Sequence, residues 1–509
     1  MARKWWTLIV VCVATFMLLL DITVVNVALP DIQRDLGASL SSLQWVVDAY
    51  ALTLASFLLV AGSLGDRLGR RRVFAVGLGI FTFASLLCGL SGDPTLLNLA
   101  RGLQGIGGGA MFATSLALIA QEFEGRERGT AMGAWGASIG GGVAIGPLVG
   151  GLLTDGLGWE WIFFINIPIG LIAVALTSTK LVNVAASDPQ PIDWAGLVTF
   201  SAGLFLLIFG LIRGNAEGWG SLVIVASLVG AAVLLAAFVA VEMRQRHAML
   251  DLSLFRKPSF TGVSAVAFAL SAGMFAIFLY ITLYIQNVLG YSPLEAGLRF
   301  IPLTLLSFFV SPIAGKLSAR VPARLLLGLG LGLVGASLLL MRGITPASEW
   351  TTLLPGFIVA GIGIGMVNPG IASTAIGVVD AARAGMASGI NNTFRQVGIA
   401  TGVAALGAVF QAQIDSKLSE LLPNAPSGLA EVVASGGTQA AAQVAPPGSE
   451  AQVSDAATQA FVASMNEILL IGAVVALAGA VLGLFLVRRR DFVAQPGAEP
   501  TAEPVAEPA

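Results

Sequence analysis

Three charged residues lie within long apolar stretches of the N-terminal part of the chain: Asp21, Asp48 and Arg101. At 1.5 Å of helix rise per residue, each lies roughly 9–13 Å from the nearest break in its apolar run. A charge at the centre of a membrane-spanning helix costs about 2.5–3.5 kcal/mol on insertion scales, so such groups pair inside a bundle or face a wet cavity. We predict that the three residues cluster, leaving one surplus carboxylate that exchanges protons with water. A purely structural Asp–Arg pair is the alternative.

Weaker signals indicate a substrate cavity. Aromatic rings attract flat apolar cations, and a polar patch opens a later apolar run near residue 391. Core or lipid packing is the alternative for the rings, and a polar helix end is the alternative for the patch. The candidate cavity residues are Gln104, Phe275, Phe278, Tyr284, Asn391 and Arg395.

A second group of charges has a structural explanation. Ser292 to Glu295 has the pattern of a capping box, with Pro293 at the first helical position. Glu295 is therefore predicted to stabilise a helix start. Arg299, one turn later, is expected to pair with Glu295.

Several classes of chemistry are excluded by composition. His247 is the one histidine of the chain, and Cys12 and Cys88 both lie in apolar runs, which leaves no metal-ligand or nucleophile–base constellation. The formal net charge of −2 gives no nucleic-acid footprint. We expect neither an enzyme nor a channel, and neither a metal nor a cofactor.

The elements that must position these residues are membrane-spanning helices. Of the 509 residues, 56% are hydrophobic and 11% are charged, whereas about a quarter of a soluble protein is charged. A spanning helix needs about 20 apolar residues. The chain has fourteen such runs: 5–29, 44–64, 73–91, 95–120, 131–153, 161–178, 194–212, 221–241, 260–286, 294–316, 324–341, 351–377, 387–411 and 466–487.

The distribution of basic residues orients these runs. With the N-terminus in the cytoplasm, twenty of the 27 Lys and Arg residues fall on the cytoplasmic side, four fall outside and three fall within runs. This bias is what the positive-inside rule predicts. We predict a multi-pass protein of the cytoplasmic membrane with both termini cytoplasmic, an outer loop over 412–465 and a disordered tail over 491–509.

The sequence also contains an internal repeat. The segment 62–67 (GSLGDR) recurs as 315–320 (GKLSAR), and Gly105-Ile-Gly107 recurs as Gly361-Ile-Gly363. Repeated halves are common in transporters, with the binding site between them. The predicted organisation is a six-helix bundle over 1–178, two inserted helices over 179–245, a second six-helix bundle over 246–490 and the tail.

Four motifs resemble those of one family. The loop after the second run reads GSLGDRLGRRRVF (62–74), which resembles the signature loop of the major facilitator superfamily. RGLQGIG (101–107) resembles its proton-coupling motif, and GGGVAIGPLVGG (140–151) resembles the antiporter motif of its drug exporters. LDITVVNVALP (20–30) resembles the motif of the fourteen-helix drug:proton antiporters, and INIPIG (165–170) and LDLSLFRKPSF (250–260) also fit that family.

This resemblance implies an all-α major facilitator fold and three groups of site residues. The predicted cytoplasmic latch comprises Gly62, Gly65, Asp66, Arg67, Gly69 and Arg70. The predicted export motif comprises Gly142, Gly146, Pro147, Gly150 and Gly151. Asp21 and Arg101 belong to the implied proton-coupling network.

The chain departs from the family pattern twice. Trp159-Glu160-Trp161 has Glu where the family usually has Arg, and Ala319 replaces the loop Asp in the second half. The first departure puts in doubt an outer-gate role for that position, and the second leaves only the first latch complete.

The implied activity is proton-coupled export of lipophilic, often cationic, drugs by alternating access. The implied molecule acts as a monomer and takes its energy from the proton gradient. A dedicated exporter of one metabolite or biosynthetic product, with the same mechanism, is the alternative.

Overall fold

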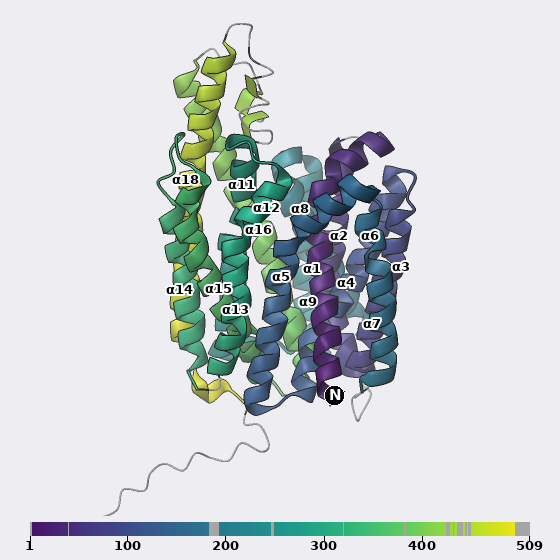
Figure 1. The fold of residues 1–509 in the computed structure, drawn as a ribbon. Helices are drawn as coiled ribbons and strands as arrows, with labels where there is room; N and C mark the ends of the chain where they lie inside the picture. Colours follow the sequence, from purple (N-terminus) through teal and green to yellow (C-terminus); the bar gives the residue numbers. More distant parts are fainter. Residues whose placement is uncertain are drawn as a thin grey trace, which may run out of the picture.

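The architecture was obtained as a computed structural model, which describes residues 3–38, 40–182, 193–245, 249–318, 320–380, 383–423, 428–430, 432–434, 441–442, 445 and 449–493. Every regular element within these residues is a helix, and the long helices run roughly parallel to one axis (Figure 1). The predicted all-α class is therefore confirmed.

The first half of the chain forms one bundle. Its helices are α1 (Arg3–Leu36), α2 (Leu40–Leu68), α3 (Arg70–Gly89), α4 (Pro94–Glu122), α5 (Gly125–Leu157), α6 (Trp161–Phe164) and α7 (Asn166–Lys180). Within it, α4 packs on both α2 and α3, and α1 packs on α5. Apolar side chains of these helices form a shared core that includes the fully buried Trp135.

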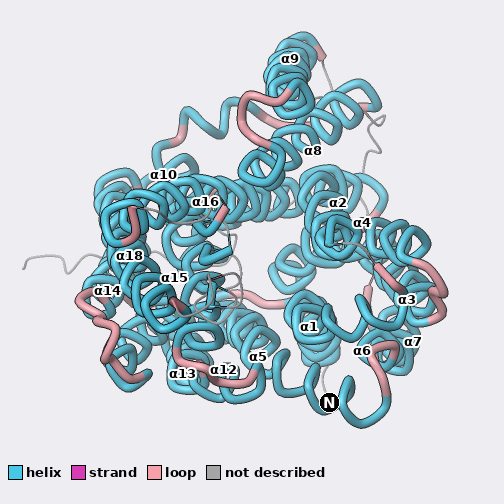
Figure 2. The backbone as a smooth tube through the Cα atoms, turned by 90° about the horizontal axis from the view of Figure 1, so that it is seen from above, coloured by secondary structure: helices cyan, strands magenta, loops and turns pink. Residues whose placement is uncertain are grey.

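The second bundle follows a pair of flanking helices. The pair is α8 (Trp194–Glu217) and α9 (Leu222–Arg244), which lie to one side of the molecule when it is seen from above (Figure 2). The second bundle comprises η1 (Leu252–Arg256), α10 (Pro258–Leu270), η2 (Ser271–Phe275), α11 (Ala276–Leu283), η3 (Tyr284–Val288), α12 (Pro293–Arg299), α13 (Ile301–Leu317), α14 (Ala323–Met341), η4 (Trp350–Leu353), α15 (Leu354–Gly377), α16 (Ala384–Leu421), α18 (Glu450–Leu486) and η6 (Arg489–Asp491). Of the flanking pair, α8 contacts both α2 and α16, so it touches both bundles.

Local sequence explains several helix starts. The Asp93 carboxylate accepts hydrogen bonds from the N–H groups of Thr95 and Leu96, with Pro94 at the first helical position of α4. The predicted capping box of Ser292 and Glu295 is present at the start of α12. Arg299 donates to the Glu295 backbone carbonyl at 2.7 Å rather than pairing with its carboxylate, so that predicted ion pair is wrong.

The number of spans is only partly supported. Within the described residues, twelve helices are long and apolar enough to cross a membrane. The remaining two predicted runs, 131–153 and 294–316, correspond to parts of α5 and to α13, where the apolar segments are the shorter Leu148–Leu157 and Ile301–Leu317. The count of fourteen therefore stays a prediction.

The structure adds detail to two predicted segments. The run 161–178 falls within the candidate span Trp161–Lys180, and the predicted outer loop, for which short helical pieces were possible, contains helical residues. The run 161–178 is divided at Ile165 into α6 and α7, because Pro168 has no N–H to bond the carbonyl of residue 164. The predicted outer loop 412–465 is largely helical at both ends, since α16 continues to Leu421 and α18 begins at Glu450. Ala, Gln, Glu and Lys there are good helix formers. The predicted tail lies outside the described residues from position 494 onward.

Glycine contacts repeat between the two halves. A Cβ at Gly107 of α4 would lie 2.7 Å from the Gly77 carbonyl oxygen, and one at Gly363 of α15 would lie 2.6 Å from that of Gly330. The same holds for Gly109 against the Leu54 carbonyl oxygen at 2.9 Å, and for Gly365 against that of Ser307 at 3.0 Å. In both contacts the α4 residue recurs 256 positions later and its partner recurs 253 positions later, so the two bundles are packed in the same way.

The bundles meet along a seam of small residues. Across it α2 packs on α16 and α5 packs on α13. Gly62 faces Gly385, and Gly129 faces Gly315, so closely that a Cβ on any of the four would strike the opposite carbonyl oxygen. The Gly129–Gly315 pair lies near the end of the bundle that holds the N-terminus, because Glu127 in the same turn of α5 pairs with Lys4. Gly62 lies in the last two turns of α2, which runs back to that end (Figure 1). The seam is thus closed at that end.

Candidate functional site

Asp21 is the centre of a buried polar network. Its side chain is 0% exposed, and its Oδ2 lies 2.5 Å from Nη1 of Arg101, whose side chain is 1% exposed. Asp21 Oδ1 also accepts hydrogen bonds from Gln104 Nε2 at 2.8 Å and from Asn166 Nδ2 at 2.9 Å. The predicted proximity of Asp21 and Arg101 is therefore confirmed. The carboxylate is matched by one guanidinium and two amide donors.

Arg101 has partners from three helices besides α1. Its Nε donates to the Val46 carbonyl of α2 at 2.9 Å, and its Nη1 donates to Gln104 Oε1 at 2.7 Å. The guanidinium carbon lies 4.3 Å from the centre of the Tyr50 ring and 5.8 Å from that of Phe163. These contacts fix the guanidinium in one orientation.

Sequence reasoning gave no role to two members of this network. Asn166 and Ser85 are buried, and Ser85 Oγ accepts a hydrogen bond from Gln104 Nε2 at 2.8 Å. An amide in the otherwise apolar INIPIG segment was an available signal for Asn166. Gln104 was predicted to line a substrate cavity, but its side chain is fully buried and bonded within the network.

The predicted third member of the charge cluster is elsewhere. Asp48 Oδ2 lies 3.8 Å from Nη1 of Arg213 in α8. Arg213 also donates to Gln44 Oε1 and to Glu217 Oε1, each at 2.8 Å. The prediction that Asp48 adds a surplus carboxylate beside Arg101 is wrong, because Asp48 has a different guanidinium as its partner.

The signature loop forms a contact across the seam. Asp66 accepts hydrogen bonds from Arg70 Nε at 3.0 Å and Arg70 Nη2 at 2.8 Å within its own half. It also accepts from the N–H of Gly385 at 3.0 Å and of Met386 at 2.8 Å, in the first turn of α16. A carboxylate satisfies unpaired N–H groups at a helix start and is favoured by the helix dipole. The side chain of Asp66 therefore holds the two halves together.

The other predicted latch residues have distinct surroundings. Gly69 has φ +100°, a conformation that favours glycine, and it precedes α3. A Cβ at Gly65 would lie 2.8 Å from Thr114 Cγ2, and Gly62 faces Gly385 across the seam. Arg67 interacts electrostatically with Glu242 of α9.

The predicted export motif packs α5 against α1. A Cβ at Gly142 would lie 2.8 Å from the Phe16 carbonyl oxygen, and one at Gly150 would lie 2.9 Å from Val24 Cγ2. Gly146 is closest to Thr23. A Cβ at Gly151 would have no neighbour within 4 Å, so this glycine does not contribute to the close contact between the two helices. The Pro147 side chain lies outside the described part of the structure.

The aromatic candidates divide into two groups. Phe275 and Phe278 are half-buried, and their ring centres lie 5.6 Å apart in an edge-on arrangement. Tyr284 is fully buried in the core of the second bundle, and its hydroxyl donates to the Ser348 carbonyl at 3.4 Å. The prediction that Tyr284 lines a cavity is wrong, because core residues surround the ring.

Asn391 and Arg395 lie one turn apart on α16, and both are buried. The Arg395 guanidinium carbon lies 5.7 Å from the centre of the Phe275 ring. The structure thus brings three of the predicted cavity residues together: Phe275, Phe278 and Arg395.

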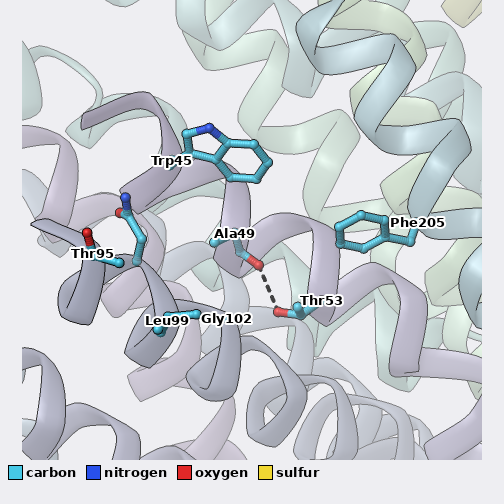
Figure 3. Close-up of a pocket in the computed structure, with 8 residues that line it drawn as sticks. Trp45, Ala49, Thr53, Thr95, Leu99, Gly102 and Phe205 are labelled. Atoms are coloured by element: carbon cyan, nitrogen blue, oxygen red, sulfur yellow. Dashed lines mark hydrogen bonds between the residues drawn. The ribbon is translucent and has the colours of Figure 1, made fainter. Parts of the chain in front are cut away.

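A pocket of about 420 Å³ lies between α2, α4 and α8 (Figure 3). Its lining residues are Trp45, Ala49, Thr53, Thr95, Asn98, Leu99, Gly102 and Phe205. The Thr53 hydroxyl is occupied by a hydrogen bond to the Ala49 carbonyl at 2.8 Å. None of the predicted cavity residues lines this pocket.

Known proteins share this sequence and fold. The family model described as "Major Facilitator Superfamily" matches residues 11–403. The multidrug resistance protein Stp of Mycobacterium tuberculosis is 37% identical over 422 residues, 82% of this chain and 78% of that protein. The tetracenomycin C resistance and export protein of Streptomyces glaucescens is 32% identical over 498 residues, 95% of this chain and 91% of that protein.

A solved structure supports the fold. The proton:xylose symporter XylE matches with a TM-score of 0.62 at 13% identity, covering 96% of each chain. The family model spans most of the chain, and the helical arrangement agrees with it. This multi-pass membrane protein belongs to the major facilitator superfamily.

Proposed function

We propose that this chain is a proton-driven antiporter that exports lipophilic small molecules, drugs among them, across the cytoplasmic membrane. The buried ion pair of Asp21 and Arg101 is the observation that carries this proposal. A buried charge pair is costly to keep in a membrane and is most often functional. Similarity to relatives named for multidrug resistance and for antibiotic export supports the direction and the type of substrate.

Proton uptake at Asp21 changes what the network can hold. Protonation removes the negative charge that Arg101 faces at 2.5 Å, while Gln104 Oε1 and the Val46 carbonyl still accept from the guanidinium. The interaction of Arg101 with α1 then becomes weaker, whereas its hydrogen bond to the backbone of α2 does not change. Because Asp21 is bonded to α4 and α7, its charge state alters how α1 sits against both helices.

The seam supplies the conformational part of the cycle. In the structure it is closed at the end that holds the N-terminus, where Asp66 bonds the first turn of α16. With both termini cytoplasmic and fourteen spans, this closed end is the cytoplasmic one. Transport then requires the Asp66 contacts to break so that substrate can enter from the cytoplasm.

Export of one dedicated product by the same mechanism is a second candidate. It is favoured by the 32% identity to a protein named for both resistance to and export of tetracenomycin C, which extends over 95% of this chain. A susceptibility panel in an efflux-deficient host separates the two. Protection against several unrelated compounds supports a multidrug exporter, and protection against one supports a dedicated exporter.

The coupling is tested by drug uptake into everted membrane vesicles with an imposed pH gradient. Asp21→Asn removes the titratable group and should abolish gradient-driven uptake while substrate binding persists. Asp21→Glu keeps a carboxyl group on a longer arm and should retain part of the uptake. Wild-type coupling in Asp21→Asn, at a matched protein level, would show that the ion pair is only structural.

A further inference from the structure

Four arginines within the described residues are buried, and three of them have hydrogen-bond acceptors. Arg70 donates to Asp66, Arg101 donates to Asp21 and Gln104, and Arg213 donates to Gln44 and Glu217. Such pairing is the general rule, because an unpaired charge in a membrane interior is costly. The fourth is Arg395.

Arg395 is 8% exposed and has no acceptor in the described part of the chain. The Phe275 ring lies beside it, with the ring centre 5.7 Å from the guanidinium carbon. Arg395 is the eleventh residue after the start of α16, which places it roughly 16 Å along that helix, near the middle of a 30 Å bilayer.

Two more polar groups without partners lie beside this arginine. Asn391, one turn earlier on α16, is 3% exposed and its Nδ2 has no acceptor. Ser271 is buried, and its hydroxyl has no partner. The Ser271 Cβ lies 3.0 Å from the position that a Cβ on Gly398 would occupy. Gly398 is three residues after Arg395 on α16, so Ser271 lies within one turn of Arg395. Among the described residues, this wall of the bundle therefore has polar groups with unused hydrogen-bonding capacity.

The neighbouring backbone is also unusual. Ser271–Phe275 is a π-helical turn between α10 and α11, and α16 packs against it. Single π-helical turns are frequent at functional sites. Phe275 and Phe278 extend from this region and place aromatic surface beside the guanidinium.

Within the described ranges, no carboxylate pairs with Arg395. Asp21, Asp48 and Asp66 each face another guanidinium, and no ion pair in the described residues involves Arg395. Arg395 therefore lacks a charge-balancing anion in the part of the chain that the structure describes, and a bound substrate would supply one.

We infer that Arg395 and Asn391 form an anion-binding subsite that takes the carboxylate of a lipophilic organic anion. The planar guanidinium binds a carboxylate through two parallel hydrogen bonds, and the Asn391 amide adds a donor. Phe275 and Phe278 contact the apolar body of the molecule. This inference rests on the proposed export function and narrows its substrates to include acids, beyond the cations suggested by aromatic rings alone.

The test compares two probes that share one aromatic body. Binding of 1-pyrenebutyrate and of 1-pyrenebutylamine to the purified full-length protein in lipid nanodiscs is measured by equilibrium dialysis against empty nanodiscs. Arg395→Gln should weaken pyrenebutyrate binding roughly ten- to a hundredfold, as expected for lost charge-assisted hydrogen bonds. Binding of the amine should stay the same or improve. Arg395→Lys should retain part of the pyrenebutyrate affinity.

Two further variants keep the result interpretable. Arg342→Gln removes an exposed guanidinium elsewhere in the second bundle and should leave both probes unaffected. Asn391→Asp places a carboxylate one turn from Arg395 and should displace pyrenebutyrate without lowering the thermal stability. Equal pyrenebutyrate affinity in the wild type and Arg395→Gln would overturn the inference, and so would an equal loss in Arg342→Gln.

Failure of this inference is distinct from failure of the proposed function. Asp21→Asn should abolish gradient-driven uptake yet leave pyrenebutyrate binding intact. If Arg395→Gln binds pyrenebutyrate normally while Asp21→Asn still stops uptake, the export proposal stands and the anion subsite is rejected.

Discussion

Asp66 makes the most extensive side-chain contact across the seam. Its two oxygens accept from the Arg70 side chain in one half and from two backbone N–H groups of α16 in the other. A carboxylate at a partly buried helix N-terminus contributes up to about 2 kcal/mol. This one residue therefore shifts the open–closed equilibrium of that end of the molecule toward the closed state.

We predict that Asp66→Asn leaves folding near normal and lowers transport strongly. The neutral amide loses the ion pair with Arg70 and the interaction with the helix dipole, which should shift the closed–open equilibrium by about 1–2 kcal/mol, a factor of roughly 5–30. The measurement is the initial rate of uptake into everted vesicles at matched protein levels. Arg71→Lys is the matched control, since Arg71 donates to the Ser178 carbonyl and makes no contact with Asp66 among the described residues. Full transport by Asp66→Asn would argue that the loop charge only orients the protein.

Depth along a helix was predictable from the sequence, but the direction of a side chain around it was not. Asp21 and Arg101 were placed together correctly by depth. Asp48 has a similar depth, but Val46 of the same helix already faces Arg101. Two residues correspond to about 200° around a helix, so Asp48 points away from Arg101 and toward α8. Its partner Arg213 is far along the chain, and no local pattern indicated it.

We predict that Asp48 and Arg213 act as a pair. Asp48→Asn should reduce gradient-driven uptake less than Asp21→Asn does, because a second carboxylate, Glu217, still contacts Arg213. The double variant Asp48→Asn/Arg213→Gln should lose less than the sum of the two single variants, as expected for residues in contact. The measurement is a double-mutant cycle on thermal stability and uptake. Strict additivity would mean that the 3.8 Å contact contributes nothing.

Among the elements, α4 depends most on having no side chain at particular positions. A Cβ at Gly105 would strike the Tyr50 carbonyl oxygen and the Thr53 hydroxyl, whereas one at Gly102 would meet only Thr53 Cγ2, at 3.8 Å. Two glycines three residues apart therefore have different requirements. Gly105 permits the approach of α2, while Gly102 borders the open pocket (Figure 3).

We predict that Gly105→Ala destabilises the protein and Gly102→Ala does not. Overpacking typically costs about 1–3 kcal/mol, and here the obstacle at Gly105 includes backbone that cannot rotate away. The measurement is the apparent melting temperature of each purified variant in detergent. A similar melting temperature for both variants would show that α2 and α4 can separate without cost.

The positions of helices were predictable from the sequence where a local sequence pattern determines them. The Ser292–Glu295 capping box and the apolar core of each run were predictable, and the break before α7 was available from Pro168. The π-helical turns of η2 and η3 were not predictable, because no local sequence pattern marks them; η2 packs against α16 and η3 against α11 and α12.

At the scale of the whole molecule, the number of crossings decides how the halves relate to the membrane. Helices α5 and α13 pack together across the seam, so whether each crosses the bilayer sets the side on which every later loop lies. The position of α8 and α9 beside the bundles was not predictable. A helix that is apolar on all sides, such as α9, has no face that indicates its neighbour.

We predict fourteen crossings. Single cysteines at Glu124 and Asp155 lie at the two ends of α5, and cysteines at Leu294 and Ser318 lie before and after α13. Within each pair, a membrane-impermeant thiol reagent should label one position from outside the cell and the other only from inside. Labelling of both members of a pair from the same side would reduce the count.

The repeated glycine contacts indicate that the two halves of the chain arose by duplication and then diverged. Contacts on α2 and α3 recur 253 positions later, as from Gly77 to Gly330, and contacts on α4 recur 256 positions later, as from Gly107 to Gly363. The three extra residues must lie in the connection before α15, where an insertion leaves the packing unchanged. By the same register, the counterparts of Arg101 and Gln104 on α15 are Phe357 and Ala360, both 0% exposed. The two copies kept one architecture, but only the first retained or acquired this part of the polar network, so the ancestral symmetry survives in shape and not in chemistry.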